Sequence, residues 1–368
     1  MWLAFDRRLI LRFDWLLFLV VLIILGLGML NLYSASFSLG VKGSFYKKQL
    51  IWLGFGFLLL FIGAFMNYSR LEEMGYFFYF FVIILLILVD LQGKTVSGSR
   101  RWLSFGFFNI QPSEFAKLFL IVVLAKWFKK NFTPNGLGVT NLIFPTILIL
   151  IPFGLIFLQP DLGTAIILLL IFLSLVFFIK IRFWCCFLFI IIALFVLPFS
   201  WKYLLKDYQR ERIIHFLNPE ADPLGRGYQT LQSKIAIGSG KLWGKGFLKG
   251  TQSHLNFIPE KYTDFVFSVF AEEWGFGGVL FLLLLYFFVL FRFIKISSHA
   301  KDSFGLILGY GISALFFWQI IINIGMTIGL LPIVGVSLPL FSYGGSSLIV
   351  SMFCVGVIIN IHIQQYLF

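Results

Sequence analysis

Ten apolar runs, most of them long enough to cross a lipid bilayer, constrain this chain more than any other feature. A membrane-spanning helix needs about 20 mostly apolar residues, and short polar segments separate these runs. The pattern predicts an all-α polytopic membrane protein with about ten transmembrane helices. The expected spans are about 15–33, 50–66, 75–91, 113–127, 142–158, 162–179, 183–200, 265–291, 304–325 and 346–363.

The composition excludes the main water-soluble classes of protein. Of the 368 residues, 60% are hydrophobic and only 12% are charged, whereas soluble domains carry about 25% charged residues. A chain with half the usual charge cannot cover a water-facing surface. This excludes a soluble enzyme, a disordered chain and a nucleic-acid-binding domain. Little of the chain remains outside the spans, so we expect one membrane-embedded domain over residues 1–368.

The charges of the short loops indicate which way the helices run. With the N-terminus inside, the short inner segments hold 12 Lys and Arg residues and the short outer segments hold 6. Cytoplasmic loops are enriched in Lys and Arg, so we expect both termini to be cytoplasmic. One large extracytoplasmic loop, about 201–264, then lies between the seventh and eighth helices.

The long outer loop also carries a net positive charge. The chain carries 29 Lys and Arg against 16 Asp and Glu, a net charge of +13, and the long loop holds ten of these bases. A basic surface on the outside of the membrane argues against nucleic acid as a partner. It fits an anionic, diphosphate-bearing lipid or a polyanionic polymer.

One pair of opposite charges stands at the start of the fourth span. An ionisable group inside a span is costly, and is therefore a candidate for function. Glu114 and Lys117 are three residues apart, which places them on one face of a helix. They are interpreted either as a neutralising ion pair that stabilises the bundle or as the charged wall of an outward-facing cavity. Position alone favours the ion pair.

Three spans begin at the outer surface with polar residues, after Gln111, at Gln159-Pro160-Asp161 and at Ser342–Ser347. Helix N-termini attract phosphate and other anions, so their convergence near Arg101 would form an anion-binding floor. The alternative is ordinary helix capping. The apolar stretch Leu330–Ser346 contains two prolines and a Gly-Gly pair. It is either a re-entrant element that lines a cavity or a simple turn between two spans.

Asp264 stands at the boundary of the eighth span. An Asp in this place is more often a helix N-cap, but it can also be a general base whose pKa is raised by an apolar pocket. Four-residue spacings place it on one helical face with Ser268 and Glu272. The sequence has no H-x-x-x-H pair and no Walker loop, so neither metallohydrolase nor ATP-driven chemistry is indicated.

Several motifs together resemble the SEDS family (shape, elongation, division and sporulation). They run through most of the chain, and their combination is highly specific. The GKG and GTQS pieces of the outer loop are more similar to the elongation branch of the family than to the division branch. The matching segments are Arg101-Trp102-Leu103, QPSEFAK (111–117), QPDLGTA (159–165), the loop and span start 227–276, and GLLPIVGVSLPLFSYGGSSL (329–348).

The resemblance implies a peptidoglycan glycosyltransferase that polymerises lipid II into β-1,4 glycan at the outer face of the bacterial cytoplasmic membrane during cell elongation. It places the family's catalytic aspartate, in a T-D-F motif, on Asp264. Arg101 and Lys117 are then candidates for binding the diphosphate of the substrate. The full set of expected substrate-binding residues is Arg101, Glu114, Lys117, Asp161, Lys245 and Ser342.

The resemblance also implies partners and a cofactor. The expected partners are the lipid II substrate, a class B penicillin-binding protein that acts as transpeptidase, and other elongation-complex proteins. A divalent cation, Mg²⁺ or Mn²⁺, is expected at the diphosphate, although no residue cluster specifies one. Two positions depart from the family pattern: Tyr262 stands where His is frequent, and Ser337 where Pro is frequent. The first change leaves a proton relay at that position unsupported.

Two other functions remain open on the sequence. A lipid II flippase would carry its substrate across the membrane, and transporters place their ionisable groups near the bilayer midplane. A non-catalytic scaffold for the transpeptidase would need no base. Asp264, Glu114 and Asp161 gather instead at the outer boundary of their spans, which favours chemistry at the membrane surface.

Overall fold

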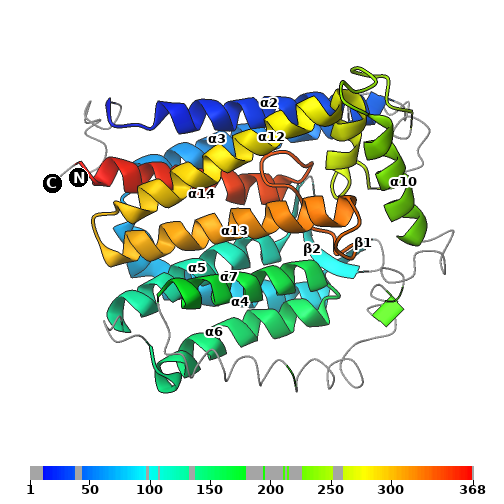
Figure 1. Cartoon of the computed structure of the whole chain (residues 1–368). Coiled ribbons are helices and arrows are strands. Elements are labelled where there is room, and N and C mark those ends of the chain that lie inside the picture. The colour runs from blue at the N-terminus through cyan, green and yellow to red at the C-terminus, as the bar shows by residue number, and fades with distance from the viewer. Residues whose placement is uncertain are drawn as a thin grey trace.

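A bundle of long helices forms most of the molecule (Figure 1). The computed structural model describes residues 11–37, 44–96, 99–106, 108–131, 137–179, 226–251 and 260–366, with residues 194, 210, 211 and 214. The helices are α2 Trp15–Phe37, α3 Ser44–Phe65, α4 Ser69–Gln92, α5 Pro112–Asn131, α6 Val139–Leu158, α7 Leu162–Phe178, α10 Arg226–Ser239, α12 Val266–Ser298, α13 Ser303–Thr327 and α14 Gly345–Gln364.

The prediction of a polytopic membrane protein is confirmed. In the described part of the chain, seven helices are long and apolar enough to cross a membrane: α2, α3, α4, α6, α12, α13 and α14. Helix α7 is apolar but shorter, and α5 carries the charges Glu114, Lys117, Lys126, Lys129 and Lys130. The expected span 183–200, and the outer loop up to residue 225, fall almost entirely outside the described residues.

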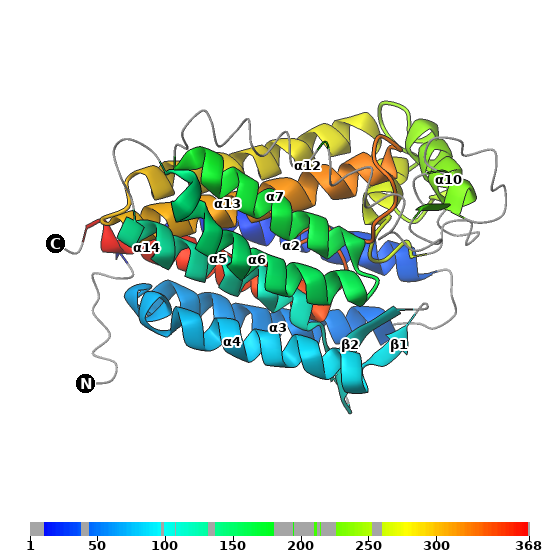
Figure 2. The same ribbon diagram turned by 90° about the horizontal axis from the view of Figure 1, so that it is seen from below.

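The beginning of α2 and the end of α14 lie at one end of the bundle, while the small β-sheet and α10 lie at the opposite end (Figures 1 and 2). At the first end, the Asp14 carboxylate pairs with Arg292 and the Arg12 guanidinium lies over the Tyr366 ring. The first contact joins the N-terminal segment to α12, and the second joins it to the C-terminal segment.

Helix α14 is nearly enclosed by the other helices, because it has no charged residue and carries small side chains where it meets α3. A Cβ at Gly356 would lie 2.2 Å from the carbonyl oxygen of Leu60, and a Cβ at Gly63 would lie 3.0 Å from that of Phe353. Small residues allow helix backbones to approach closely, and such contacts drive helix association in membranes. This packing fixes the N-terminus of α14, which enters the candidate site.

A three-stranded antiparallel sheet departs from the all-α expectation. Strands β1 Lys94–Val96, β2 Ser99–Phe105 and β3 Phe108–Ile110 connect α4 to α5 in the order β1-β2-β3. Hydropathy over a span-length window does not detect such short strands. The sheet carries Arg101 and Trp102 across the end of the bundle.

The segment between α13 and α14 contains no regular helix or strand. Its residues Val334, Val336, Leu338 and Phe341 are all buried, so the chain folds back into the protein and does not cross over its surface. Irregular backbone is tolerated at membrane depth where it is buried in protein or lines a cavity. Of the two interpretations of Leu330–Ser346, the structure therefore supports the re-entrant element and not the simple turn between two spans.

Candidate active site

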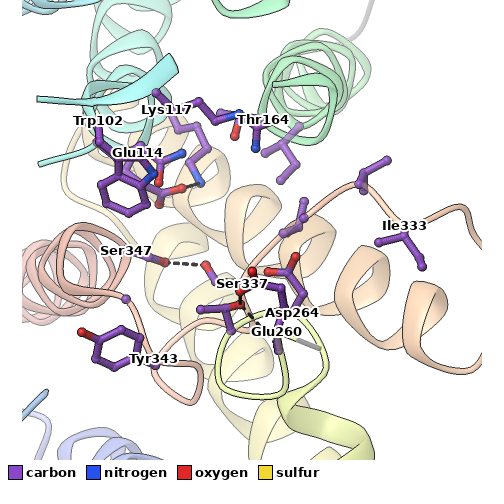
Figure 3. A pocket seen from close by; sticks show the side chains of 18 of the residues that line it. Trp102, Glu114, Lys117, Thr164, Glu260, Asp264, Ile333, Ser337, Tyr343 and Ser347 are labelled. Atoms are coloured by element: carbon purple, nitrogen blue, oxygen red, sulfur yellow. Dashed lines mark hydrogen bonds and ion pairs between the residues drawn. The ribbon is translucent and has the colours of Figure 1, made fainter. Parts of the chain in front are cut away.

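A cavity of about 480 Å³ lies at the end of the bundle that carries the sheet and α10. Figure 3 shows Asp264 and Glu260 across this cavity from Glu114 and Lys117. The lining comes from segments far apart in the sequence: Arg101, Trp102, Gln111, Glu114, Lys117, Thr164, Ile167, Gln229, Glu260, Thr263, Asp264, Ile333–Ser337, Tyr343, Gly344 and Ser347.

Asp264 occupies a tight turn just before α12. The backbone N–H groups of Thr263, Asp264 and Phe265 all donate to the Glu260 carbonyl, at 3.2, 3.1 and 3.3 Å. This turn presents the Asp264 carboxylate to the irregular segment before α14, where a Cβ on Gly335 would lie 3.3 Å from Oδ2. Gly335 has φ +76°, a conformation that favours glycine, and the absent side chain leaves the carboxylate accessible.

The helix-cap interpretation of Asp264 is wrong. Phe265 is the N-cap residue of α12, and it makes no side-chain cap bond. Because Asp264 precedes the helix, the expected helical face shared with Ser268 and Glu272 does not form. The Ser268 hydroxyl donates to the Phe265 carbonyl, and the Glu272 carboxylate turns toward Lys245. Only Asp264 of these three lines the cavity.

The surroundings of Asp264 favour a carboxyl group that exchanges protons near neutral pH. Burial removes water from the carboxylate and, with the nearby charge of Glu260, raises its pKa to about 6, although the Thr263 hydroxyl and the Arg101 guanidinium act in the opposite direction. A general base works best when its pKa lies close to the working pH. The shift therefore suits Asp264 to accepting a proton.

Arg101 is held over the cavity by α7. Its guanidinium lies 3.6 Å from Asp161 Oδ1 and donates to the Pro160 carbonyl. Asp161 also caps α7, because its carboxylate accepts from the Thr164 N–H at 3.3 Å and the Thr164 hydroxyl at 3.0 Å. Asp161 does not line the cavity, and its expected contact with substrate stays a prediction. Among the described residues, the buried Arg101 Nε has no hydrogen-bond acceptor.

Glu114 and Lys117 form an ion pair and also line the cavity. Lys117 Nζ lies 2.7 Å from Glu114 Oε1, and the two side chains are only 2% and 9% exposed. The two interpretations of this pair are therefore both compatible with the structure.

The expected convergence of helix N-termini is confirmed. Residues from the first turns of α5, α7 and α14 all line the cavity. The Gln111 N–H donates to the Ser346 hydroxyl at 3.0 Å, which joins α5 to α14. The Gln111 side-chain amide donates to Asp161 at 3.2 Å, which joins α5 to α7. Three helix dipoles thus point their positive ends at one space.

Besides Asp161, two of the expected substrate-binding residues, Lys245 and Ser342, lie outside the cavity lining. Lys245 Nζ lies 2.7 Å from Glu272 Oε1 and 2.7 Å from the Thr251 hydroxyl, so it fastens the outer loop to α12. The Ser342 hydroxyl donates to the Thr263 carbonyl at 2.7 Å and accepts from the Leu338 N–H at 2.8 Å. Contact of either with substrate stays a prediction.

Several lining residues were not expected from the sequence. Glu260 and Thr263 stand beside Asp264 in the chain, and this proximity could have indicated them. Gln229 lies on α10 of the outer loop, and no pattern in the sequence indicates that it reaches the site. Gly335 and Tyr343 belong to the stretch before α14, for which the lining of a cavity was one of two interpretations.

The chain is similar to known proteins over nearly its whole length. The sequence profile of the FtsW/RodA/SpoVE family, described as cell cycle protein, matches residues 14–367. The peptidoglycan glycosyltransferase MrdB of Escherichia coli K12 is 38% identical over 347 residues, which cover 94% of this chain and 92% of that one. The peptidoglycan glycosyltransferase RodA of Treponema pallidum is 32% identical, with 96% and 98% of the two chains covered.

Solved structures share the fold. A chain of a peptidoglycan synthase complex, reported for its coordination of polymerisation and crosslinking, superposes with a TM-score of 0.82 at 32% identity and covers 100% of both chains. The rod shape determining protein RodA of Thermus thermophilus superposes with a TM-score of 0.72 at 31% identity over 99% of both chains. The chain therefore belongs to the SEDS family of multi-pass membrane proteins.

Proposed function

We propose that this chain is a peptidoglycan glycosyltransferase that polymerises lipid II at the outer face of the bacterial cytoplasmic membrane, with Asp264 as the general base. One observation carries the assignment of the site. The Asp264 carboxylate shares a cavity with the N-termini of three helices and with Arg101 and Lys117. A base is thus placed beside a site that favours anions. The names of the full-length relatives support the same activity.

The reaction needs a proton acceptor and a stabilised leaving group. The 4-hydroxyl of the acceptor sugar attacks the anomeric carbon of the donor, and its proton passes to the Asp264 carboxylate. As the new C–O bond forms, the bond from the anomeric carbon to the diphosphate oxygen breaks. Undecaprenyl diphosphate then leaves with the electron pair, and a single displacement inverts the α-linked donor to a β-1,4 link.

The negative charge that develops on the diphosphate requires positive groups already in place. Arg101 is fixed by Asp161 and the Pro160 carbonyl, and Lys117 by Glu114. Charged groups and N–H dipoles that are held in position before the reaction stabilise the transition state without reorganising. The positive ends of the α5, α7 and α14 helix dipoles, whose first turns line the same cavity, add to this stabilisation.

The described residues do not form a protein cage for a divalent cation. Among the described residues, no group of three or more His, Cys, Asp or Glu side chains could hold a metal ion. Mg²⁺ is bound in many phosphate-transferring sites by one or two carboxylates together with substrate phosphates. A cation in this site would depend on the diphosphate for most of its ligands, and no step of the mechanism proposed here requires one.

We also propose that the chain works with a class B penicillin-binding protein. The structural relative with a TM-score of 0.82 was solved in a peptidoglycan synthase complex, and it covers this chain from end to end. A transpeptidase that crosslinks the stem peptides of new strands would act on the product of this site. The elongation complex is the expected setting for the pair.

Purified protein given lipid II in detergent is expected to release undecaprenyl diphosphate and to form glycan strands that a muramidase digests. In proteoliposomes, a flippase would move labelled lipid II between leaflets without forming these products. If folded protein that binds lipid II translocates it without synthesising glycan, the proposed function is wrong and the protein is a transporter. Glycan synthesis that occurs only when a separate active glycosyltransferase is added would support a non-catalytic scaffold.

The rate of polymerisation should depend on pH through Asp264. Because its pKa is raised to about 6, kcat/KM is expected to fall about tenfold for each pH unit below about 6, where the base is protonated. Glu260→Gln removes a negative charge that raises this pKa, so the acidic limb should move to lower pH. Arg101, which lowers this pKa, and Asp161, which raises it, both remain in this variant. A limb that stays in place would contradict the assignment.

A further inference from the structure

The backbone that carries Asp264 is fastened from outside its own turn. The three successive carbonyls of residues 262–264 each accept a hydrogen bond from a distant part of the chain. The first accepts from the Tyr343 N–H at 2.9 Å, the second from the Ser342 hydroxyl at 2.7 Å, and the third from the Asn323 amide at 3.1 Å. Three anchored peptides in a row leave the turn little freedom to rotate the carboxylate.

Asn323 occupies a special place among these anchors. It lies in α13, is fully buried, and its Nδ2 donates both to the Asp264 carbonyl at 3.1 Å and to the Val336 carbonyl at 2.7 Å. One amide nitrogen therefore joins the turn of the base to the irregular segment that faces it. A carboxamide has two N–H donors in one plane, which neither a carboxylate nor a single hydroxyl offers.

The two chain segments joined by Asn323 meet at the reactive carboxylate. The Val336 carbonyl follows Gly335, at which a Cβ would lie 3.3 Å from Asp264 Oδ2 and 4.0 Å from Arg101 Nη1. A displacement of the Asp264 turn would change the distance between the base and the guanidinium, and a displacement of the irregular segment would change the space between Gly335 and both groups. A shift of about 1 Å in a reacting group can cost about 100-fold in rate.

We propose that Asn323 is a positioning residue for the glycosyl transfer. It holds the Asp264 turn and the 334–337 segment in the relative position that directs the carboxylate into the cavity. This proposal rests on the proposed role of Asp264 as the base. Asn323 itself does not line the cavity, so it acts on the reaction through Asp264 and not by touching substrate.

A second buried asparagine provides a matched control. Asn360, in α14, is also fully buried, and its side chain joins α14 to the end of α3 and the start of α4. Its Nδ2 donates to the Ala64 carbonyl at 2.7 Å, and its Oδ1 accepts from the Tyr68 N–H at 3.0 Å. This amide makes comparable bonds far from the cavity, where a structural loss has no direct effect on the base.

The test compares Asn323→Ala with Asn360→Ala in the full chain. We expect Asn323→Ala to lower the rate at saturating lipid II about 100-fold while KM changes less than about threefold, because substrate contacts remain. Asn360→Ala should lower the melting temperature and keep the rate of the folded fraction. If Asn323→Ala does not fold, Asn323→Ser, which keeps one donor, carries the same test with a smaller expected loss in kcat.

The possible outcomes separate this proposal from the function on which it rests. A folded Asn323 variant with the wild-type kcat, or with a loss confined to KM, would overturn the positioning role. An equal fall in kcat for Asn360→Ala would also overturn it, because the effect would then belong to any buried amide. Asp264→Asn measured in the same assay tests the base itself. If that variant is inactive while Asn323→Ala is fully active, only the positioning role fails.

Discussion

Replacing Asp264 by asparagine is expected to reduce glycan polymerisation by about 10²–10⁴-fold, the range that positioned general bases contribute. The amide keeps the size of the side chain but cannot accept the proton of the attacking hydroxyl. The turn around Asp264 is held by backbone bonds to the Glu260 carbonyl, so we expect the variant to fold. Binding of lipid II, measured in detergent with a fluorescent analogue, should remain within about threefold of wild type.

Asp302→Asn gives a matched control for this substitution. Asp302 is the N-cap of α13 and pairs with Lys129 at 3.4 Å, in contacts that do not include the cavity. Its replacement should reduce thermal stability slightly and leave the rate unchanged. An Asp264→Asn enzyme that polymerises at the wild-type rate would remove Asp264 from the mechanism.

Much of the architecture follows from hydropathy alone. The apolar runs expected at 75–91 and 113–127 lie within α4 and α5, which extend beyond them at both ends. Apolar runs indicate which part of a helix is buried in lipid or protein. A hydropathy window does not detect the polar turns at the two ends of the helix. The helix starts were more informative, because the polar residues at Gln111, Asp161 and Ser346 do meet at one site.

Other features depend on tertiary contacts that no local pattern contains. The sequence places Asp264 where helix caps are common, yet the capping position falls on Phe265, because the Glu260 carbonyl closes a turn first. Lys245 was among the residues expected to bind substrate. The structure shows that a buried carboxylate, Glu272, holds it. The effect of Asn323 requires two segments to meet around α13, which periodicity does not reveal.

The Glu114–Lys117 pair can be tested for two roles at once, and the effects should be large. Lys117→Met alone leaves the Glu114 carboxylate buried and unpaired, which typically costs about 3–5 kcal/mol. We expect this variant to lose most of its folded population or to melt at a much lower temperature. Replacing both residues, with Glu114→Gln and Lys117→Met, removes the uncompensated charge and should restore most of the melting temperature, because neutral replacements of buried pairs are often tolerated.

Activity of the double variant then decides what the pair does. If the pair only neutralises itself inside the bundle, the stable double variant should polymerise lipid II at close to the wild-type rate. We expect instead a loss of about 100-fold or more, comparable to the removal of one preorganised donor from a reacting oxyanion, because Lys117 lines the cavity beside the N-termini of α5, α7 and α14. Arg292→Met with Asp14→Asn is the control pair. It removes an ion pair at the opposite end of the bundle and should leave polymerisation intact.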